Sequence, residues 1–155
     1  MGICLRAASQ EDLRALHALD QTCFRPGIAY SLAEMQYFLS HPRSISLIAE
    51  DESGQLAGFI VAEGASPSRR RSAHIVTIDI SPAFRRRGIG RLLMQAAEAR
   101  LMAAGAEAIR LEVAVDNDAA QRFYASLGYE IRGEIRGYYL GTLDALAMEK
   151  DLSKT

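Results

Sequence analysis

The 155-residue sequence predicts a mixed α/β fold in a single domain spanning residues 1–155. Strand and helix patterns alternate along the whole chain, in the order strand, two helices, three strands, helix, strand, helix and two strands. The middle of the chain reads strand–helix–strand, which predicts a parallel strand pair joined by a crossover helix. We therefore expect a central, mixed, twisted sheet of about seven strands flanked by about four helices.

The first third of the chain predicts one strand and two helices. The strand covers residues 3–7. Ser9 then suits the N-cap of a helix whose apolar residues recur at helical spacing up to Pro26. Ser31 and Glu34 form the signature of a capping box and predict the start of a second helix.

The rest of the chain predicts six strands, two helices and a polar loop over residues 66–72. The strands are expected at 45–50, 56–65, 74–80, 109–113, 129–135 and 143–150, and the helices at 88–104 and 117–127. Gly105 and Gly128 follow these two helices and are typical of helix C-termini.

Composition excludes several classes of protein. The net charge of −1 argues against nucleic acid as the main partner, because phosphate binding leaves a basic footprint. No apolar run reaches the length of a membrane span, and the N-terminus lacks a signal-peptide pattern. Cys4 and Cys23 have no neighbours at metal-ligand spacing, so we expect no metal site and a reducing, cytoplasmic setting.

A basic, glycine-containing loop lies between the strand at 74–80 and the helix that follows it. It reads Arg85-Arg86-Arg87-Gly88-Ile89-Gly90 and continues with Arg91. Glycines allow the backbone to approach a ligand closely, and the first turn of a helix offers free N–H groups to a pyrophosphate. Arginines add charge-assisted hydrogen bonds to phosphate oxygens. Alternatively, the glycines only shape the turn and the arginines form a solvated face.

This loop resembles the phosphate-binding signature of the GNAT superfamily of acetyltransferases, Arg/Gln-x-x-Gly-x-Gly/Ala. Arg85, Gly88 and Gly90 match it in residue type and in position between a strand and a helix. The resemblance is strong from about Ile75 to the end. It extends through Leu111-Glu112-Val113, Asn117, Ala119-Ala120, Phe123-Tyr124, Leu127-Gly128-Tyr129, Tyr138-Tyr139 and Asp144-Ala145. These later residues look like the branch that acetylates protein N-termini, in particular the ribosomal-protein-alanine N-acetyltransferase (RimI) type.

The resemblance implies a GNAT fold and an acetyl-coenzyme A-dependent N-acetyltransferase. In this superfamily a primary amine attacks the acetyl thioester directly in a ternary complex. The residues it implies for the coenzyme, besides the loop from Arg85 to Arg91, are Ile78, Asp79, Ile80, Asn117, Ala120 and Tyr124. The backbone of the strand at 78–80 is expected to bind the pantetheine arm and to stabilise the oxyanion.

Glu112 is the candidate general base. It occupies the Leu-Glu-Val position where the superfamily carries its base, and it lies in an otherwise apolar strand. Burial of such a carboxyl would raise its pKa towards neutrality. The alternative is a glutamate on a surface-facing edge.

Tyr124 is the candidate general acid, because the resemblance places this tyrosine against the coenzyme sulfur. A phenol has an unperturbed pKa of about 10, which suits proton donation to a departing thiolate. The alternative is an aromatic residue that faces the core. Asn117, seven residues earlier, also suits the N-cap of the same helix.

Asp79 suggests a separate hypothesis. If it projects from the same face as Glu112 on a neighbouring strand, the two form a carboxylate pair in which one pKa is raised. The alternative is a solvated aspartate at the strand end.

The acceptor side is expected to include Phe24 to Tyr30, Tyr138, Tyr139 and Glu112, which resemble walls that hold a peptide N-terminus. The histidines, including His74, show no metal spacing and no nucleophile partner. Two other functions remain open: acetylation of a small amine or amino acid, and a non-catalytic acyl-coenzyme A-binding module. The sequence is compatible with a monomer or a homodimer.

Overall fold

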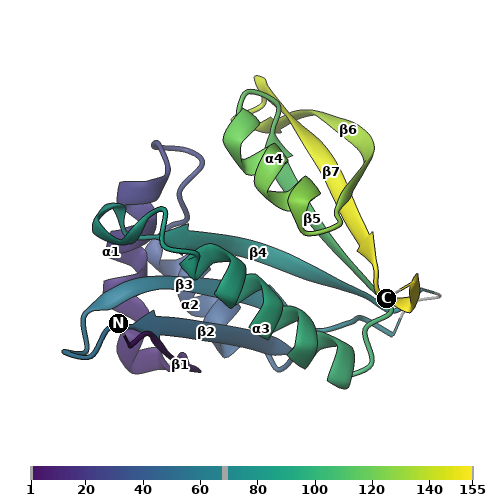
Figure 1. The fold of residues 1–155 in the computed structure, drawn as a ribbon. Helices are drawn as coiled ribbons and strands as arrows, with labels where there is room; N and C mark the ends of the chain where they lie inside the picture. The colour runs from purple at the N-terminus through teal and green to yellow at the C-terminus, as the bar shows by residue number, and fades with distance from the viewer. Residues whose placement is uncertain (1, 68–69, 155) are drawn as a thin grey trace.

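The computed structural model describes residues 2–67 and 70–154 (Figure 1). Residues 68 and 69, in the loop expected over 66–72, lie outside the described residues. The strands are β1 (Cys4–Ala7), β2 (Ser44–Glu50), β3 (Leu56–Glu63), β4 (Ser72–Ile80), β5 (Ala108–Ala114), β6 (Glu130–Tyr139) and β7 (Leu143–Asp151). The helices are α1 (Leu13–Cys23), α2 (Leu32–Ser40), α3 (Ile89–Ala103) and α4 (Asp118–Ser126). Short 3₁₀ turns occupy Gln10–Asp12, Pro82–Phe84 and Leu152–Lys154.

The described strands form one mixed sheet in the order β1-β2-β3-β4-β5-β7-β6. All neighbours are antiparallel except β4 and β5, which are parallel and are joined through α3. The predicted mixed α/β fold and its element order are therefore confirmed.

Local sequence signals determine where the helices begin. Ser31 and Glu34 form the expected capping box at α2: the Glu34 N–H donates to Ser31 Oγ at 3.1 Å, and the Ser31 N–H donates to Glu34 Oε1 at 2.9 Å. Most strand boundaries differ from expectation by one or two residues, and the end of β6 differs by four. β4 begins two residues earlier, because Ser72 pairs with β5, and β6 continues to Tyr139, next to a turn in which Leu140 has a positive φ.

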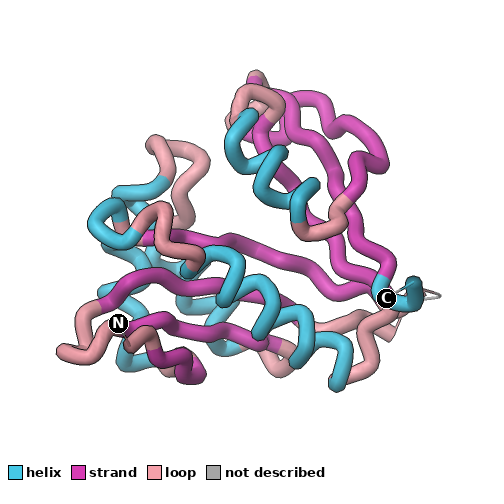
Figure 2. The backbone as a smooth tube through the Cα atoms, in the orientation of Figure 1, coloured by secondary structure: helices cyan, strands magenta, loops and turns pink. Residues whose placement is uncertain are grey.

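Helices cover both faces of β2 to β4 (Figure 2). Successive residues of β3 alternate between the two layers. Ile60 belongs to the cluster that contains Leu93 of α3, whereas Phe59 packs in the cluster of Leu16 of α1 and Met35 of α2. Because both faces are covered, β3 is an almost continuous apolar strand. Within the described residues, no helix combines the length and the apolar character needed to cross a membrane.

Two irregularities of β4 create the space for a site. A β-bulge opposite Val61 and Ala62 shifts the alternation, so that Ile75 and Ile78 pack on the α3 side. Val76 packs on the α1 side. In addition, β4 pairs with β5 only over its first three residues, after which the two strands separate, as Figure 1 shows.

Candidate active site

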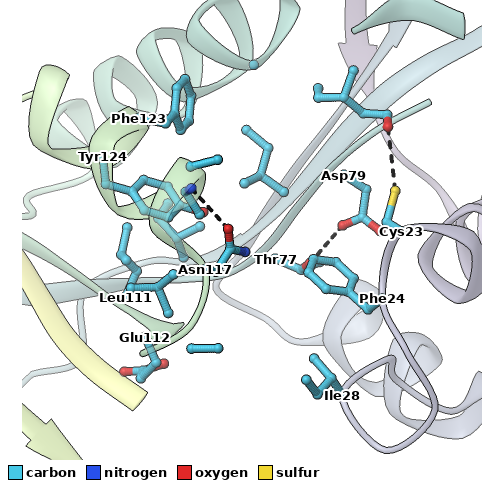
Figure 3. Close-up of a pocket in the computed structure, with 18 of the residues that line it drawn as sticks. Cys23, Phe24, Ile28, Thr77, Asp79, Leu111, Glu112, Asn117, Phe123 and Tyr124 are labelled. Atoms are coloured by element: carbon cyan, nitrogen blue, oxygen red, sulfur yellow. Dashed lines mark hydrogen bonds between the residues drawn. The ribbon is translucent and has the colours of Figure 1, made fainter. Parts of the chain in front are cut away.

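A cavity of about 900 Å³ opens where β4 and β5 separate. Its lining comes from the end of α1 and the segment after it, β4, the loop before α3 and the first turn of α3, β5, the loop before α4 and α4 itself, and the end of β6. Figure 3 shows Phe24 and Ile28 on the wall opposite Tyr124 and Glu112. The cavity is therefore built by residues from both halves of the chain.

A smaller hollow of about 300 Å³ lies at the start of α3. Gly88 is the N-cap of this helix and has a φ of +77°, which favours glycine. At Gly90 a Cβ atom would stand 3.3 Å from the ring of Phe123, so a side chain there would narrow the space. The free N–H groups of the first turn and the positive end of the helix dipole are directed to this hollow. This arrangement suits a pyrophosphate.

The four arginines of this region diverge. Arg86 lines both hollows and Arg91 lines the smaller one, where it also donates to Ser126 Oγ at 2.9 Å. Arg85 also lines both hollows, and its Nε donates to the Ile80 carbonyl at 3.1 Å. Arg87 lines neither hollow and stacks over the ring of Phe84, 5.2 Å from its centroid. The structure thus places Arg87 outside both hollows, and its expected role in phosphate binding stays a prediction.

The edge of β4 lines the main cavity. Ile78, Asp79 and Ile80 pair with β3 on one side and line the cavity on the other. Because β5 has separated from β4 at this level, the cavity reaches the strand itself. An extended ligand can therefore lie along β4 in place of a neighbouring strand.

Glu112 lines the cavity and is held by two neighbours. It lies 2.7 Å from His74 Nε2 and accepts a hydrogen bond from the Tyr138 hydroxyl at 3.3 Å. Burial raises the pKa of Glu112, but the hydrogen bonds and the charge of His74 outweigh burial and hold the pKa below its ordinary value. The expected net rise of the Glu112 pKa towards neutrality is therefore wrong, and Glu112 is a carboxylate at neutral pH.

His74 is the neighbour that sequence reasoning missed, since no local spacing connects it to Glu112. The parallel register supplies the signal: His74 lies opposite Arg110, two residues before Glu112. His74 itself does not line the cavity. Its imidazole therefore contacts the Glu112 carboxylate from the side away from the cavity and orients it.

Tyr124 and Asn117 stand on the α4 side. Asn117 is the N-cap of α4, as expected, and its Oδ1 accepts from the Ala120 N–H at 3.1 Å. Tyr124 and Ala120 line the cavity, and burial raises the pKa of the Tyr124 phenol above its ordinary value. The tyrosine therefore keeps its proton at neutral pH.

Asp79 does not pair with Glu112. Its carboxyl accepts a hydrogen bond from Thr77 Oγ1 at 2.7 Å and neighbours Asp20 of α1. Only 1% of Asp79 is exposed, so the alternative of a solvated aspartate is also wrong. Burial and Asp20 raise the pKa of Asp79 to about 9.

Aromatic and apolar side chains form the remaining wall. Phe24, Ile28, Tyr30 and Tyr139 line the cavity. Tyr138 lies outside it, but its hydroxyl reaches Glu112 and its ring stands edge-on to Tyr139, with centroids 4.8 Å apart. This aromatic and apolar wall therefore extends as far as the Glu112 carboxylate.

The profile of the acetyltransferase (GNAT) family matches residues 13–129. The chain belongs to the GNAT family. It is 31% identical to the catalytic subunit NAA10 of the N-terminal acetyltransferase A complex of Arabidopsis thaliana, with 97% of this chain and 78% of that protein covered.

Two solved structures share the fold over nearly the whole chain. A chain of the NatC complex bound to Gag peptide and CoA has a TM-score of 0.87 at 25% identity, covering 98% of this chain and 99% of that one. The ribosomal-protein-S18-alanine N-acetyltransferase of Escherichia coli has a TM-score of 0.86 at 23% identity, covering 97% and 94%. The second likeness concerns the fold alone.

As a GNAT member, the chain is an N-acetyltransferase that uses acetyl-CoA. The residues present fit this coenzyme. The α3 N-terminus and Gly90 leave room for a pyrophosphate, and the separated edge of β4 offers a track for the pantetheine arm. The pyrophosphate hollow and the cavity along β4 adjoin each other, because Arg86 and Gly90 line both.

Proposed function

We propose that this GNAT enzyme acetylates the α-amino group at the N-terminus of a protein or peptide. The likeness to an N-terminal acetyltransferase subunit over 97% of this chain is the observation that carries the proposal, and the lowered pKa of Glu112 agrees with it. A carboxylate of low pKa is a weak base and suits an amine that is already partly neutral. An α-amino group has a pKa of about 8, whereas that of lysine is about 10.4. The NAA10 relative, named as an N-terminal acetyltransferase subunit, supports the same class of acceptor.

We assign roles to the residues that line the cavity. Bound acetyl-CoA supplies the acetyl thioester. The α3 N-terminus, with Arg86 and Arg91, would bind the pyrophosphate, and Asn117 and Ala120 would border the pantetheine arm. Backbone N–H groups of β4 at 78–80 would stabilise the oxyanion.

Two side chains would move protons. A carboxylate oxygen of Glu112, oriented by His74 and Tyr138, takes the proton of the amine directly or through one water. The Tyr124 phenol keeps its proton until the thiolate departs and then donates it. Phe24, Tyr30 and Tyr139 surround the first residue of the acceptor.

A small amine is the second candidate acceptor. The cavity of about 900 Å³ lies within the size range of small-molecule sites, roughly 300–1,000 Å³. A non-catalytic acyl-CoA-binding module is disfavoured, because Glu112 and Tyr124 both line the cavity.

Thiol release from acetyl-CoA tests the proposal. Peptides with free N-termini, the same peptides with blocked N-termini, and small amines are compared at matched concentrations. Turnover of free peptides that is lost on blocking supports the proposal. Turnover of small amines alone would falsify it, and coenzyme binding with no turnover would indicate the binding module.

The proposal includes the cellular compartment and the partners of the enzyme. Cys4 and Cys23 are both free thiols, and Cys4 is exposed, which supports a reducing, cytoplasmic compartment. We propose a monomer or homodimer whose partners are acetyl-CoA and the acceptor, without nucleic acid or membrane.

A further inference from the structure

Two buried carboxyl groups are neighbours at one side of the cavity: Asp79 lines the cavity and Asp20 does not. Asp20 of α1 is 0% exposed and Asp79 of β4 is 1% exposed. Asp20 Oδ2 accepts a hydrogen bond from the Tyr30 backbone N–H at 2.7 Å, and Asp79 Oδ1 accepts from Thr77 Oγ1 at 2.7 Å. Among the described residues, the two remaining oxygens, Asp20 Oδ1 and Asp79 Oδ2, are buried without a hydrogen-bond donor.

Simple electrostatics excludes two carboxylates in this arrangement. Adjacent buried anions repel, and one oxygen of each carboxylate would lack a hydrogen-bond donor. A single proton between the free oxygens removes one charge and gives both atoms a hydrogen-bond partner. The two side chains are near enough to interact, because Asp20 raises the pKa of Asp79 directly.

The groups around the pair do not neutralise it. Titratable neighbours come from three elements: Cys23 of α1, Tyr30 of the segment after α1, and Tyr124 of α4. Arg85 supplies a positive charge that lowers the pKa of Asp79, but burial and Asp20 have the larger, opposite effects. The Arg85 guanidinium donates to the Ile80 carbonyl and to Cys23 Sγ, and no hydrogen bond from it reaches the carboxyls among the described residues.

We propose that Asp20 and Asp79 share one proton, and that this protonated pair positions the acceptor wall on the strand that carries acetyl-CoA. Asp20 fixes the backbone of Tyr30, whose hydroxyl donates to the Val76 carbonyl of β4 at 3.4 Å. The ring of Tyr30 also packs edge-on against Phe38 of α2. The pair thus connects α1, the segment that ends at Tyr30, and β4.

The shared proton makes folding depend on pH in a defined direction. The pKa of Asp79 is raised in the folded state from its ordinary value of 3.8 to about 9. The folded protein therefore holds one proton more than the unfolded chain between these values. The stabilisation is complete below the ordinary pKa, decreases as the pH rises, and is lost once the pH has passed the folded-state pKa.

Unfolding measured against pH tests the shared proton without any activity assay. Asp79→Asn and Asp20→Asn replace the proton with an amide N–H. Relative to either variant, the unfolding constant of the parent enzyme should rise about tenfold per pH unit between roughly pH 5 and 8. Asp51→Asn is the control, because the pKa of this exposed carboxyl is lowered and its linkage lies at acid pH. Parallel curves for the parent and both pair variants overturn the proposal.

Infrared spectroscopy covers the case in which a variant does not fold. At pH 7 the parent enzyme should show the C=O stretch of a buried, protonated carboxylic acid, and the Asn variants should lack it. An absent band in the folded parent enzyme also overturns the proposal.

The positioning role rests on the proposed function and has its own test. Asp20→Ala should raise the KM for the acceptor roughly tenfold and change the KM for acetyl-CoA less than about twofold. Asp20→Asn should recover most of the loss, since its amide can accept from Tyr30 and donate to Asp79. An Asn variant as impaired as the Ala variant, or a loss confined to the coenzyme KM, contradicts positioning. If the enzyme shows the shared proton but turns over no amine, the proposal for the Asp20–Asp79 pair holds and the proposed function is refuted.

Discussion

Glu112 and Asp79 lie on the two strands that separate to form the cavity. The Glu112 side chain is half-buried and Asp79 is fully buried. Their protonation differs because their burial and their partners both differ. Glu112 receives hydrogen bonds from His74 and Tyr138, which hold its pKa below the ordinary value. Asp79 receives one from Thr77 and faces a second carboxyl, and its pKa is raised. Whether a carboxyl in this site is charged therefore depends on its neighbours as well as on its burial.

Glu112→Gln should have the largest effect on activity, because it removes the carboxylate that is charged. We expect kcat/KM for the acceptor to fall about 100- to 10,000-fold, the range for a lost general base. Thiol release measures the loss, and Glu134→Gln on the exposed strand β6 is the matched control. A loss below about threefold would show that Glu112 is not the base.

Tyr124→Phe should have the next largest effect. The phenol keeps its proton because burial raises its pKa, and the variant removes only that hydroxyl. We expect kcat to fall about 100-fold while coenzyme affinity changes less than about twofold. Tyr37→Phe on α2, where the side chain is 60% exposed, should leave kcat unaltered. An unchanged kcat in the Tyr124 variant would show that solvent, and not Tyr124, donates the proton to the thiolate.

Local patterns predicted the parts of this site that depend on short stretches of sequence. The glycine loop before α3, the N-cap at Asn117 and the position of Glu112 in β5 all follow from residues within a few positions of one another. The same reasoning predicted the seven strands and their order along the chain, because strand alternation and helix periodicity are local properties.

The pairings of the carboxyls could not be predicted in this way. His74 meets Glu112 through the register of two parallel strands, and Asp79 meets Asp20 through the packing of α1 on β4. The β-bulge in β4 adds a further obstacle, because it shifts which residues share a face and plain alternation does not reveal it.

His74→Gln tests the partner that keeps Glu112 charged. The variant removes the charge and alters the hydrogen bond, both of which lower the pKa of Glu112. That pKa should rise, so the acid limb of the kcat/KM profile should move to higher pH by about one unit, with a loss of roughly tenfold on that limb. His17→Gln on α1 is the control. An acid limb that stays in place would show that His74 does not set the charge of Glu112.

Tyr138→Phe should give the smallest change and separates the two donors to Glu112. Its hydroxyl stands 3.3 Å from the carboxylate, against 2.7 Å for His74 Nε2, so it supplies the weaker hydrogen bond. We expect the acid limb to move in the same direction as in the His74 variant but by less, with kcat/KM reduced about two- to threefold. The variant keeps the ring and its contact with Tyr139. A rise in the acceptor KM with an acid limb that stays in place would therefore assign Tyr138 to the acceptor wall. In that case His74 alone would account for the contrast between Glu112 and Asp79.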